Sequence, residues 1–317
     1  MLVLNGLAAA LAWLGRQGTR ALALSVFLGL AVPPLAAYVK PHLGETVFVL
    51  LLFSYLRTDP AALRAYVRSP RLAIAAALWI MVALPLVFGS AYAASGLRDA
   101  LPPLYTIMIL HIAIAPITSS VAFAALMGLD TALSLAALIL SNTISPLTTV
   151  AFSYLFLGTS MISPLDLGAK LLIFYVASGA AAFAVRGIAG AAWIERQRDH
   201  IDGLNVIAVF IFAIAAMDGV PRFVMADPLF AVELMALIAV IACLLVGLTV
   251  LVFMRAGADR ALVIALLAAF RNIGLVMATI GTTLPDVVWF YFALAQFPIF
   301  LMPHFLKPLA RRFAAAG

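Results

Sequence analysis

Long apolar runs recur along the whole of this 317-residue chain and constrain its fold more than any other feature. A run of roughly 18 or more apolar residues can cross the ~30 Å hydrocarbon core of a bilayer as a helix. The composition agrees, because 66% of the residues are hydrophobic and only 10% are charged. In soluble domains about half of the residues are hydrophobic and about a quarter are charged. The sequence therefore predicts an all-α polytopic membrane protein.

The apolar runs predict ten membrane spans. Residues 2–18 precede them and predict an amphipathic lead-in helix. The spans are expected over 21–38, 45–56, 72–92, 101–125, 131–157, 165–185, 204–220, 229–254, 260–282 and 287–309. An even number of spans places both termini on the same side of the membrane.

The basic residues indicate which side that is. With the N-terminus inside, fourteen of the nineteen Lys and Arg residues fall in cytoplasmic segments. The four on the outer side are Lys40, Arg98, Lys170 and Arg222, and Arg271 lies within a span. Cytoplasmic loops of membrane proteins carry the excess of positive charge. We therefore expect both termini in the cytoplasm, and the protein in a bacterial inner membrane.

Other classes are disfavoured. The pI near 9.8 does not indicate nucleic-acid binding, because the basic residues stand in small groups between spans. Cys243 is the single cysteine, so the chain forms no internal disulfide. The sequence contains no H-E-x-x-H or G-x-S-x-G pattern, which argues against an enzyme. No cofactor is indicated. The oligomeric state is open, and a monomer is compatible with the sequence.

Ten spans divide into two halves of five, residues 1–157 and 158–317. Halves with an odd number of spans have opposite orientations, the inverted-repeat plan of many transporters. The fourth span of each half contains a polar break, at "APITSSVAF" (115–123) and at "AFRNIGLV" (269–276). Pro116 removes a backbone donor and disfavours helix at Ala115. Broken helices at matching positions are the best sequence indication of a transport site.

The polar residues at these breaks are the candidate substrate and crossover residues. They are Thr118, Ser119, Ser120, Asn142, Arg271 and Asn272. Hydroxyls in membrane helices also bond their own backbone or join helices, and that alternative stays open. His111 precedes the first break by about a turn. It is a candidate proton relay, since imidazole titrates near neutrality, or a neutral hydrogen-bonded histidine.

Several segments resemble the bile acid:sodium symporter family of the bile/arsenite/riboflavin transporter superfamily. "LLLFSYLRTDPAALRAYVRSPR" is similar to the family's short second helix and the basic segment after it. "APITSSVAFAALMGLDTALSLAALILSNTISPL" is similar to its fourth and fifth helices, and "FRNIGL" resembles its ninth-helix motif. The resemblance implies a core and a panel domain, with helices 4 and 9 crossing where they unwind. It also implies an organic anion bound between the domains, alternating access, and two sodium ions behind the crossover.

The sequence departs from that family at the sodium ligands. The resemblance places Leu267 at the family's glutamate, and Arg271 replaces the glutamine before Asn272. Val121 stands at an asparagine position in the fourth helix. Leu138 stands one turn after Ser134 in the fifth, where the family has another ligand. The usual sodium sites are therefore not expected to survive.

Arg271 lies in the middle of the apolar run Leu262–Gly281, where an arginine costs about 2.5–3.5 kcal/mol on insertion scales. Three roles are open. Its guanidinium presents five donors, so it could bond the carbonyls that a cation would otherwise coordinate. It could bind an anionic substrate, or form a structural ion pair with an acidic residue.

Two function classes follow. The first is a secondary transporter of small organic anions or metabolites that works by alternating access without sodium. A sodium-coupled symporter with altered sites is its closest variant. The second is a channel or a membrane sensor on the same fold. Saturable flux would distinguish a carrier from a channel.

Overall fold

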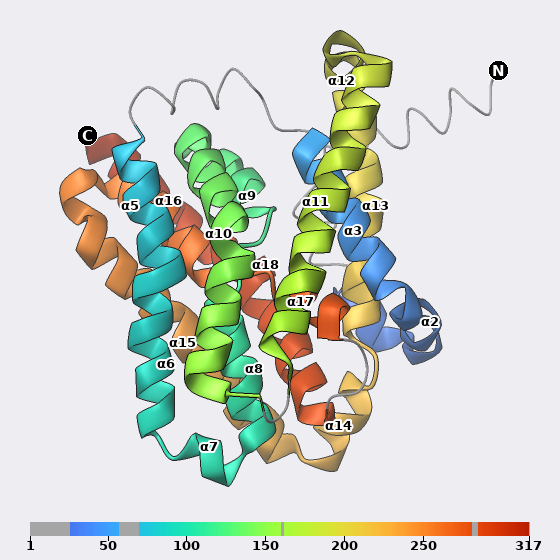
Figure 1. The fold of residues 1–317 in the computed structure, drawn as a ribbon, viewed down its shortest axis with the longest axis vertical. Coiled ribbons are helices and arrows are strands. Elements are labelled where there is room, and N and C mark those ends of the chain that lie inside the picture. Colours follow the sequence, from blue (N-terminus) through green and yellow to red (C-terminus); the bar gives the residue numbers. More distant parts are fainter. Residues whose placement is uncertain (1–25, 57–69, 160–161, 281–284, 317) are drawn as a thin grey trace. The chain divides into compact units, whose positions relative to one another are not determined.

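The computed structural model describes residues 26–56, 70–159, 162–280 and 285–316. Within them the secondary structure is helical, apart from one isolated backbone bridge (Figure 1). In this described part of the chain, six helices are long and apolar enough to cross a membrane: Pro33–Leu56, Arg71–Ala94, Thr131–Leu157, Pro164–Ala189, Arg198–Ala226 and Pro228–Ala256. They confirm the all-helical class and are consistent with a polytopic membrane protein. Ten as the number of spans stays a prediction, and the lead-in helix over 2–18 lies outside the described residues.

The chain forms two compact units. The first takes its described residues from 1–58 and 174–231, and the second from 59–173 and 232–317. Each unit therefore combines a segment from the first part of the chain with one from the second part. The inverted repeats over 1–157 and 158–317 remain predictions.

The first unit is built around α13 (Arg198–Ala216), which packs against α2 (Pro33–Val39) and α3 (Leu43–Leu56). Its apolar cluster consists of Leu56, Ala182, Ile194 and Ile201, with Leu52, Phe53 and Tyr55 against it. Residues 26–31, the 3₁₀ turn η1 (Lys40–His42), α12 (Ala191–Arg196), α14 (Val220–Ala226) and the second part of α11 (Pro164–Ala189) complete it. An ion pair of 2.9 Å joins Lys40 to Asp218.

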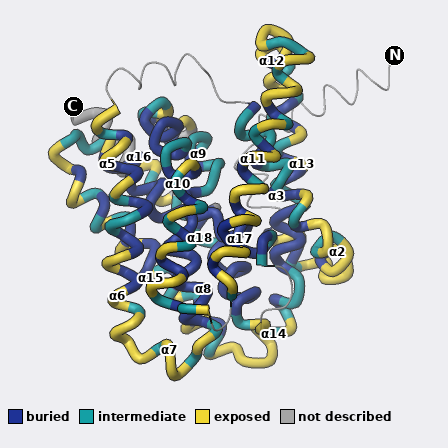
Figure 2. The backbone as a smooth tube through the Cα atoms, in the orientation of Figure 1, coloured by how far each residue is buried: buried dark blue, intermediate teal, exposed yellow. Residues whose placement is uncertain are grey.

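The second unit begins with one long interrupted helix, made of α5 (Arg71–Leu78), the π-helical η2 (Trp79–Ala83) and α6 (Leu84–Ala94). Four helices follow: α7 (Leu97–Ala100), α8 (Pro102–Ala113), α9 (Ser120–Met127) and α10 (Thr131–Leu157). The short α7 is exposed, whereas α8 is buried from Leu104 to Ala113 (Figure 2). The α10 helix is central, because it packs against α5, α6, α8, α9 and α16.

The C-terminal part of the second unit contains α15 (Pro228–Phe253), the 3₁₀ turn η3 (Met254–Ala256), α16 (Ala258–Ala269), α17 (Ile273–Ile280) and α18 (Asp286–Ala316). Every residue of α16 from Ala261 to Ala269 is buried. These nine residues are all apolar, and a helix that is apolar all round belongs in a core. A continuously buried stretch of helix therefore leads directly to Arg271.

One connection between expected spans is helical. Residues 39–44 connect the spans expected over 21–38 and 45–56, and the described chain stays helical from Pro33 to Leu56. Within this connection Lys40–His42 form a 3₁₀ turn. Pro41 sits in the first turn of this short element, where its missing N–H is tolerated.

Candidate functional site

Two helices of the second unit are interrupted at the places that the sequence indicated. The first ends with α8 at Ala113 and resumes with α9 at Ser120, while the second ends with α16 at Ala269 and resumes with α17 at Ile273. The two interruptions meet at an isolated antiparallel bridge between Pro116 and Arg271. Backbone N–H and C=O groups that have no helical partner at one interruption can therefore form hydrogen bonds with those of the other.

Two backbone hydrogen bonds make this bridge. The N–H of Ile117 donates to the carbonyl of Phe270 at 2.8 Å, and the N–H of Asn272 donates to the carbonyl of Ala115 at 2.8 Å. A buried backbone group without a partner costs free energy comparable to a lost hydrogen bond. Through this bridge, each interruption therefore supplies a hydrogen-bond donor and an acceptor to the backbone of the other.

The Arg271 side chain provides hydrogen-bond donors to further backbone carbonyls at and near the interruptions. It is 0% exposed, and its three nitrogens donate to three main-chain carbonyls. Nε donates to Ala268 at 2.8 Å, Nη1 to Ile114 at 3.0 Å and Nη2 to Ile80 at 2.9 Å. Nη1 also lies 3.8 Å from the Met81 sulfur. Arg271 thus joins the ends of α8 and α16 to the interrupted helix α5–η2–α6.

The charge of Arg271 is balanced by backbone rather than by an acid. Ion pairs between described residues include those of Lys40 with Asp218, Lys170 with Asp166 and Arg198 with Glu195, and Arg271 takes part in none of these. The C-terminal end of a helix carries roughly half a negative charge. Two such ends, those of α8 and α16, lie at the guanidinium. This geometry argues against the structural ion pair.

Two hydroxyls of α10 support the first interruption. Ser145 Oγ accepts from the N–H of Ala115 at 3.2 Å, and Thr149 Oγ1 donates to the carbonyl of Ala113 at 3.0 Å. Sequence reasoning assigned neither residue to the site. Their signal was a pair of hydroxyls four residues apart, on either side of Pro146 within the α10 helix. Such spacing puts both on one helix face.

The predicted polar residues differ in whether their side chains have a hydrogen-bond partner. Asn272 caps α17, because its Oδ1 accepts from the N–H of Leu275 at 3.2 Å. Thr118 is half-buried in the turn before α9. Within the described residues, the buried oxygens of Ser119 Oγ, Ser120 Oγ and Asn142 Oδ1 have no hydrogen-bond partner. Ser119 is the N-cap residue of α9, yet its side chain makes no capping bond. The first turn of α9 therefore lacks the side-chain capping hydrogen bond that the first turn of α17 has.

The residues present do not fit the two sodium ions that the family resemblance implies. Leu138 and Leu267 are buried at 2% and 0% exposure, and neither they nor Val121 provides a side-chain oxygen. The carbonyls freed at the interruptions, which coordinate sodium in some transporters, bond Arg271 instead.

His111 lies on α8, next to a small cavity. Its Nδ1 is 2.7 Å from the Tyr291 hydroxyl, while its buried Nε2 has no partner within the described residues. The cavity measures about 10 Å³, room for about one water molecule. Its other lining residues are apolar: Ile238, Ile241, Ala242, Leu245, Ala269, Ala295, Pro298 and Ile299. These surroundings favour the neutral, hydrogen-bonded histidine over a relay that carries charge.

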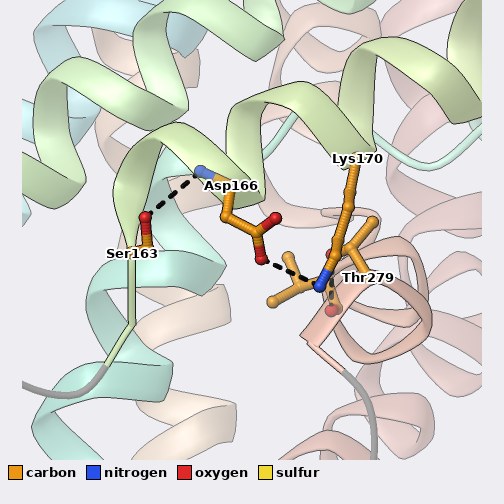
Figure 3. Close-up of polar contacts among 5 residues, drawn as sticks. Ser163, Asp166, Lys170 and Thr279 are labelled. Carbon is orange, nitrogen blue, oxygen red and sulfur yellow. Dashed lines mark hydrogen bonds and ion pairs between the residues drawn. The ribbon is translucent and has the colours of Figure 1, made fainter.

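Polar contacts near the end of the second interrupted helix are local. Figure 3 shows Ser163, Asp166 and Lys170 at the first turns of α11, and Thr279 near the end of α17. The N–H of Asp166 donates to Ser163 Oγ at 3.3 Å, and the carboxylate pairs with Lys170 at 2.9 Å. Both charged side chains are about half exposed, and exposed pairs of this kind contribute little. Both contacts lie within the first turns of α11 and act only there.

No protein-family model matches this chain, and no curated protein matches it either.

Proposed function

We propose that this protein is a secondary-active membrane transporter of small organic anions or related metabolites that works by alternating access. In this proposal it is a divergent relative of the bile acid:sodium symporters. It has ten spans in two inverted repeats, and the two interrupted helices are the crossing helices 4 and 9. Its place is a bacterial inner membrane, with both termini in the cytoplasm.

The observation that carries the proposal is the pairing of the two interrupted helices. Helices broken at membrane depth are tolerated only where protein or a polar cavity satisfies the backbone. In transporters such half-helices build the substrate and ion sites. Here the interruptions bond each other at 115–117 and 270–272. A membrane protein needs no such arrangement merely to span the bilayer.

The polarity of the helix ends favours an anionic substrate. The C-terminal ends of α8 and α16 are compensated by Arg271. The N-terminal ends of α9 and α17 follow the interruptions, and a helix N-terminus attracts negative charge. Asn272 caps α17, whereas Ser119 and Ser120 at α9 have hydroxyls without partners in the described part of the chain. We propose the start of α9 as the first contact for the anion.

Sodium independence follows from the role proposed for Arg271. Its guanidinium bonds the carbonyls that a cation would otherwise hold, and it cannot dissociate from the protein. A substrate clamp would need donors directed away from the backbone. The complete burial of Arg271, with all three nitrogens bonded to carbonyls, argues against that role.

The division into two units supports the core and panel assignment. The second unit contains both interrupted helices and corresponds to the core. The smaller first unit, from 1–58 and 174–231, corresponds to the panel. Each takes one segment from each half of the chain, as expected when both halves repeat one plan.

Thermal unfolding in sodium, potassium and choline salts at matched ionic strength tests the role of Arg271. A ligand that binds only the folded state raises its stability. We expect equal melting temperatures for the wild type in the three salts, and a lower value for Arg271→Gln in all of them. Sodium-specific stabilisation of the wild type would instead establish a sodium-coupled symporter.

Flux into proteoliposomes tests transport itself. We expect saturable uptake of at least one member of a panel of labelled small carboxylates, equal in sodium and choline media. Uptake that rises linearly with concentration would indicate a channel. No uptake of any member, from protein that melts cooperatively, would favour a non-transporting sensor.

A further inference from the structure

The helix that supplies the third acceptor of Arg271 is irregular at that point. Residues Trp79–Ala83 form the π-helical segment η2 between α5 and α6. The N–H of Leu84 bonds to the carbonyl of Trp79, five residues earlier, instead of four as in an α-helix. Single π turns inside α-helices are rare and occur frequently at functional sites. The turn therefore requires a physical cause.

Pro85 provides that cause. A proline ring clashes with the carbonyl four residues earlier in an α-helix, and proline has no N–H to donate. In the π register of Leu84 and Trp79, the next bond would join the N–H of residue 85 to the carbonyl of Ile80. Pro85 cannot make this bond, so that carbonyl lacks a donor from its own helix. It accepts from Arg271 Nη2 at 2.9 Å.

Neighbouring contacts hold the π segment in place. The Trp79 indole Nε1 donates to Thr249 Oγ1 on α15 at 3.0 Å. The Trp79 ring also lies edge-on to Phe253, with 6.2 Å between ring centroids. Met81 is fully buried beside the guanidinium. The Ile80 carbonyl is therefore presented to Arg271 by a fixed backbone.

We propose that Pro85 creates a guanidinium site, which we define by the carbonyls of Ile80, Ile114 and Ala268. Because Pro85 has no N–H, the Ile80 carbonyl stays available as the third acceptor. With this third acceptor the site fits a planar cation that has three nitrogens. The protein occupies the site with its own Arg271. This inference rests on the role proposed for Arg271, and it does not depend on transport.

The geometry selects the class of ligand. The three carbonyls bond three different nitrogens of one planar fork, and a guanidinium presents its donors in fixed directions. An alkali cation is a single centre, and urea has the same planar shape without the charge. Free guanidinium ion is the ligand expected to replace the side chain once that side chain is removed.

Thermal unfolding of Arg271→Ala with added salts tests this site. Millimolar guanidinium chloride, far below denaturing concentrations, is compared with sodium chloride, choline chloride and urea. We expect guanidinium alone to raise the melting temperature of Arg271→Ala by several degrees and to leave the wild type unchanged. Equal effects of guanidinium and sodium on the variant would overturn the proposal.

Pro85→Ala in the Arg271→Ala background tests the part played by Pro85. The new N–H at residue 85 would bond the Ile80 carbonyl within the helix. We expect most of the guanidinium effect to disappear. Pro298→Ala serves as the matched control, because Pro298 also lies inside a helix of the second unit but has no bond to Arg271. Undiminished guanidinium stabilisation after Pro85→Ala would remove Pro85 from the site.

A second measurement applies if Arg271→Ala does not fold. Pro85→Ala is introduced into the wild type and into Arg271→Gln, and the two shifts in melting temperature are compared. We expect a more favourable shift in Arg271→Gln, because there the new N–H satisfies a carbonyl that has lost its donor. Equal shifts in the two backgrounds would contradict the proposal. Flux is read separately, so a failure to transport would leave the guanidinium result standing.

Discussion

At the scale of single residues, Arg271 shows how a membrane protein keeps a charge in its core. The guanidinium bonds carbonyls from three separate helical segments. Its position in the sequence indicated a special role, but it left three roles open. Burial and bond directions favour the one in which Arg271 takes the place of a bound cation.

The first prediction concerns Arg271→Lys. An ammonium keeps the charge but cannot reach three acceptors arranged around a fork. Each buried carbonyl left without a donor costs about 1–3 kcal/mol. We expect Arg271→Lys to lower the melting temperature nearly as much as Arg271→Gln. A lysine variant as stable as the wild type would show that charge alone is sufficient.

The second prediction concerns the hydrogen bond between His111 and Tyr291. Tyr291→Phe leaves a buried imidazole with no bond at Nδ1, which we expect to cost about 1–3 kcal/mol. Adding His111→Leu removes the second polar partner, and replacing both partners by apolar groups is often nearly neutral. The double variant should therefore melt above Tyr291→Phe alone. If it melts lower, His111 has a further role.

At the scale of helices, the interruptions persist because neighbouring elements satisfy them. Pro116 explains why the helix stops after α8, but not what replaces its lost hydrogen bonds. The second interruption and the α10 hydroxyls provide the replacements. The breaks therefore belong to the packing of α8, α10 and α16 as much as to the local sequence.

The third prediction tests the α10 hydroxyls. Thr149→Val removes the bond to the Ala113 carbonyl. Side-chain hydrogen bonds between transmembrane helices average about 0.6 kcal/mol and reach about 1.7 kcal/mol. We expect a loss in the upper part of that range, measured by unfolding in mixed detergent. Thr143→Val is the control, because Thr143 is exposed and bonds only its own helix at Ile139. Equal losses would mean that the interruption does not depend on Thr149.

The fourth prediction concerns the close packing of α6. A Cβ added at Gly89 would lie 2.5 Å from the Phe156 ring, so Gly89→Ala should be clearly destabilising. Gly44→Ala is the control, since nothing lies within 4 Å of its added Cβ and alanine favours a helix by roughly 0.5–1 kcal/mol. Phe156→Leu should partly rescue Gly89→Ala. No rescue would place the strain elsewhere.

At the scale of the whole molecule, charge distribution predicts orientation. Fourteen basic residues on one side against four on the other would place both termini in the cytoplasm. The hairpin between α11 and α13 should then be cytoplasmic, and the segment around α7 should lie outside.

The fifth prediction tests that orientation with single cysteines. The background is Cys243→Ala, because Cys243 is the single native cysteine and is exposed. We expect Ala100→Cys on α7 to react with a membrane-impermeant maleimide in intact cells or spheroplasts. Ala192→Cys on α12 should react only after the membrane is opened. The reverse pattern would invert the topology, and labelling of both from outside would invalidate the span count between them.

The sequence by itself determined the helical membrane class, because burying so much apolar surface leaves few alternatives to the bilayer. It also located both interruptions, since proline and a run of polar residues disrupt a helix locally. Only the tertiary structure decided how the interruptions are satisfied. Ile80, Ser145 and Thr149 come from helices distant in the chain, and no local pattern reports which carbonyl a guanidinium will reach. Pro85 was visible in the sequence, but its consequence depended on Arg271 lying opposite. Hydrogen bonds between distant segments form only when the chain packs, so the site's chemistry belongs to the fold.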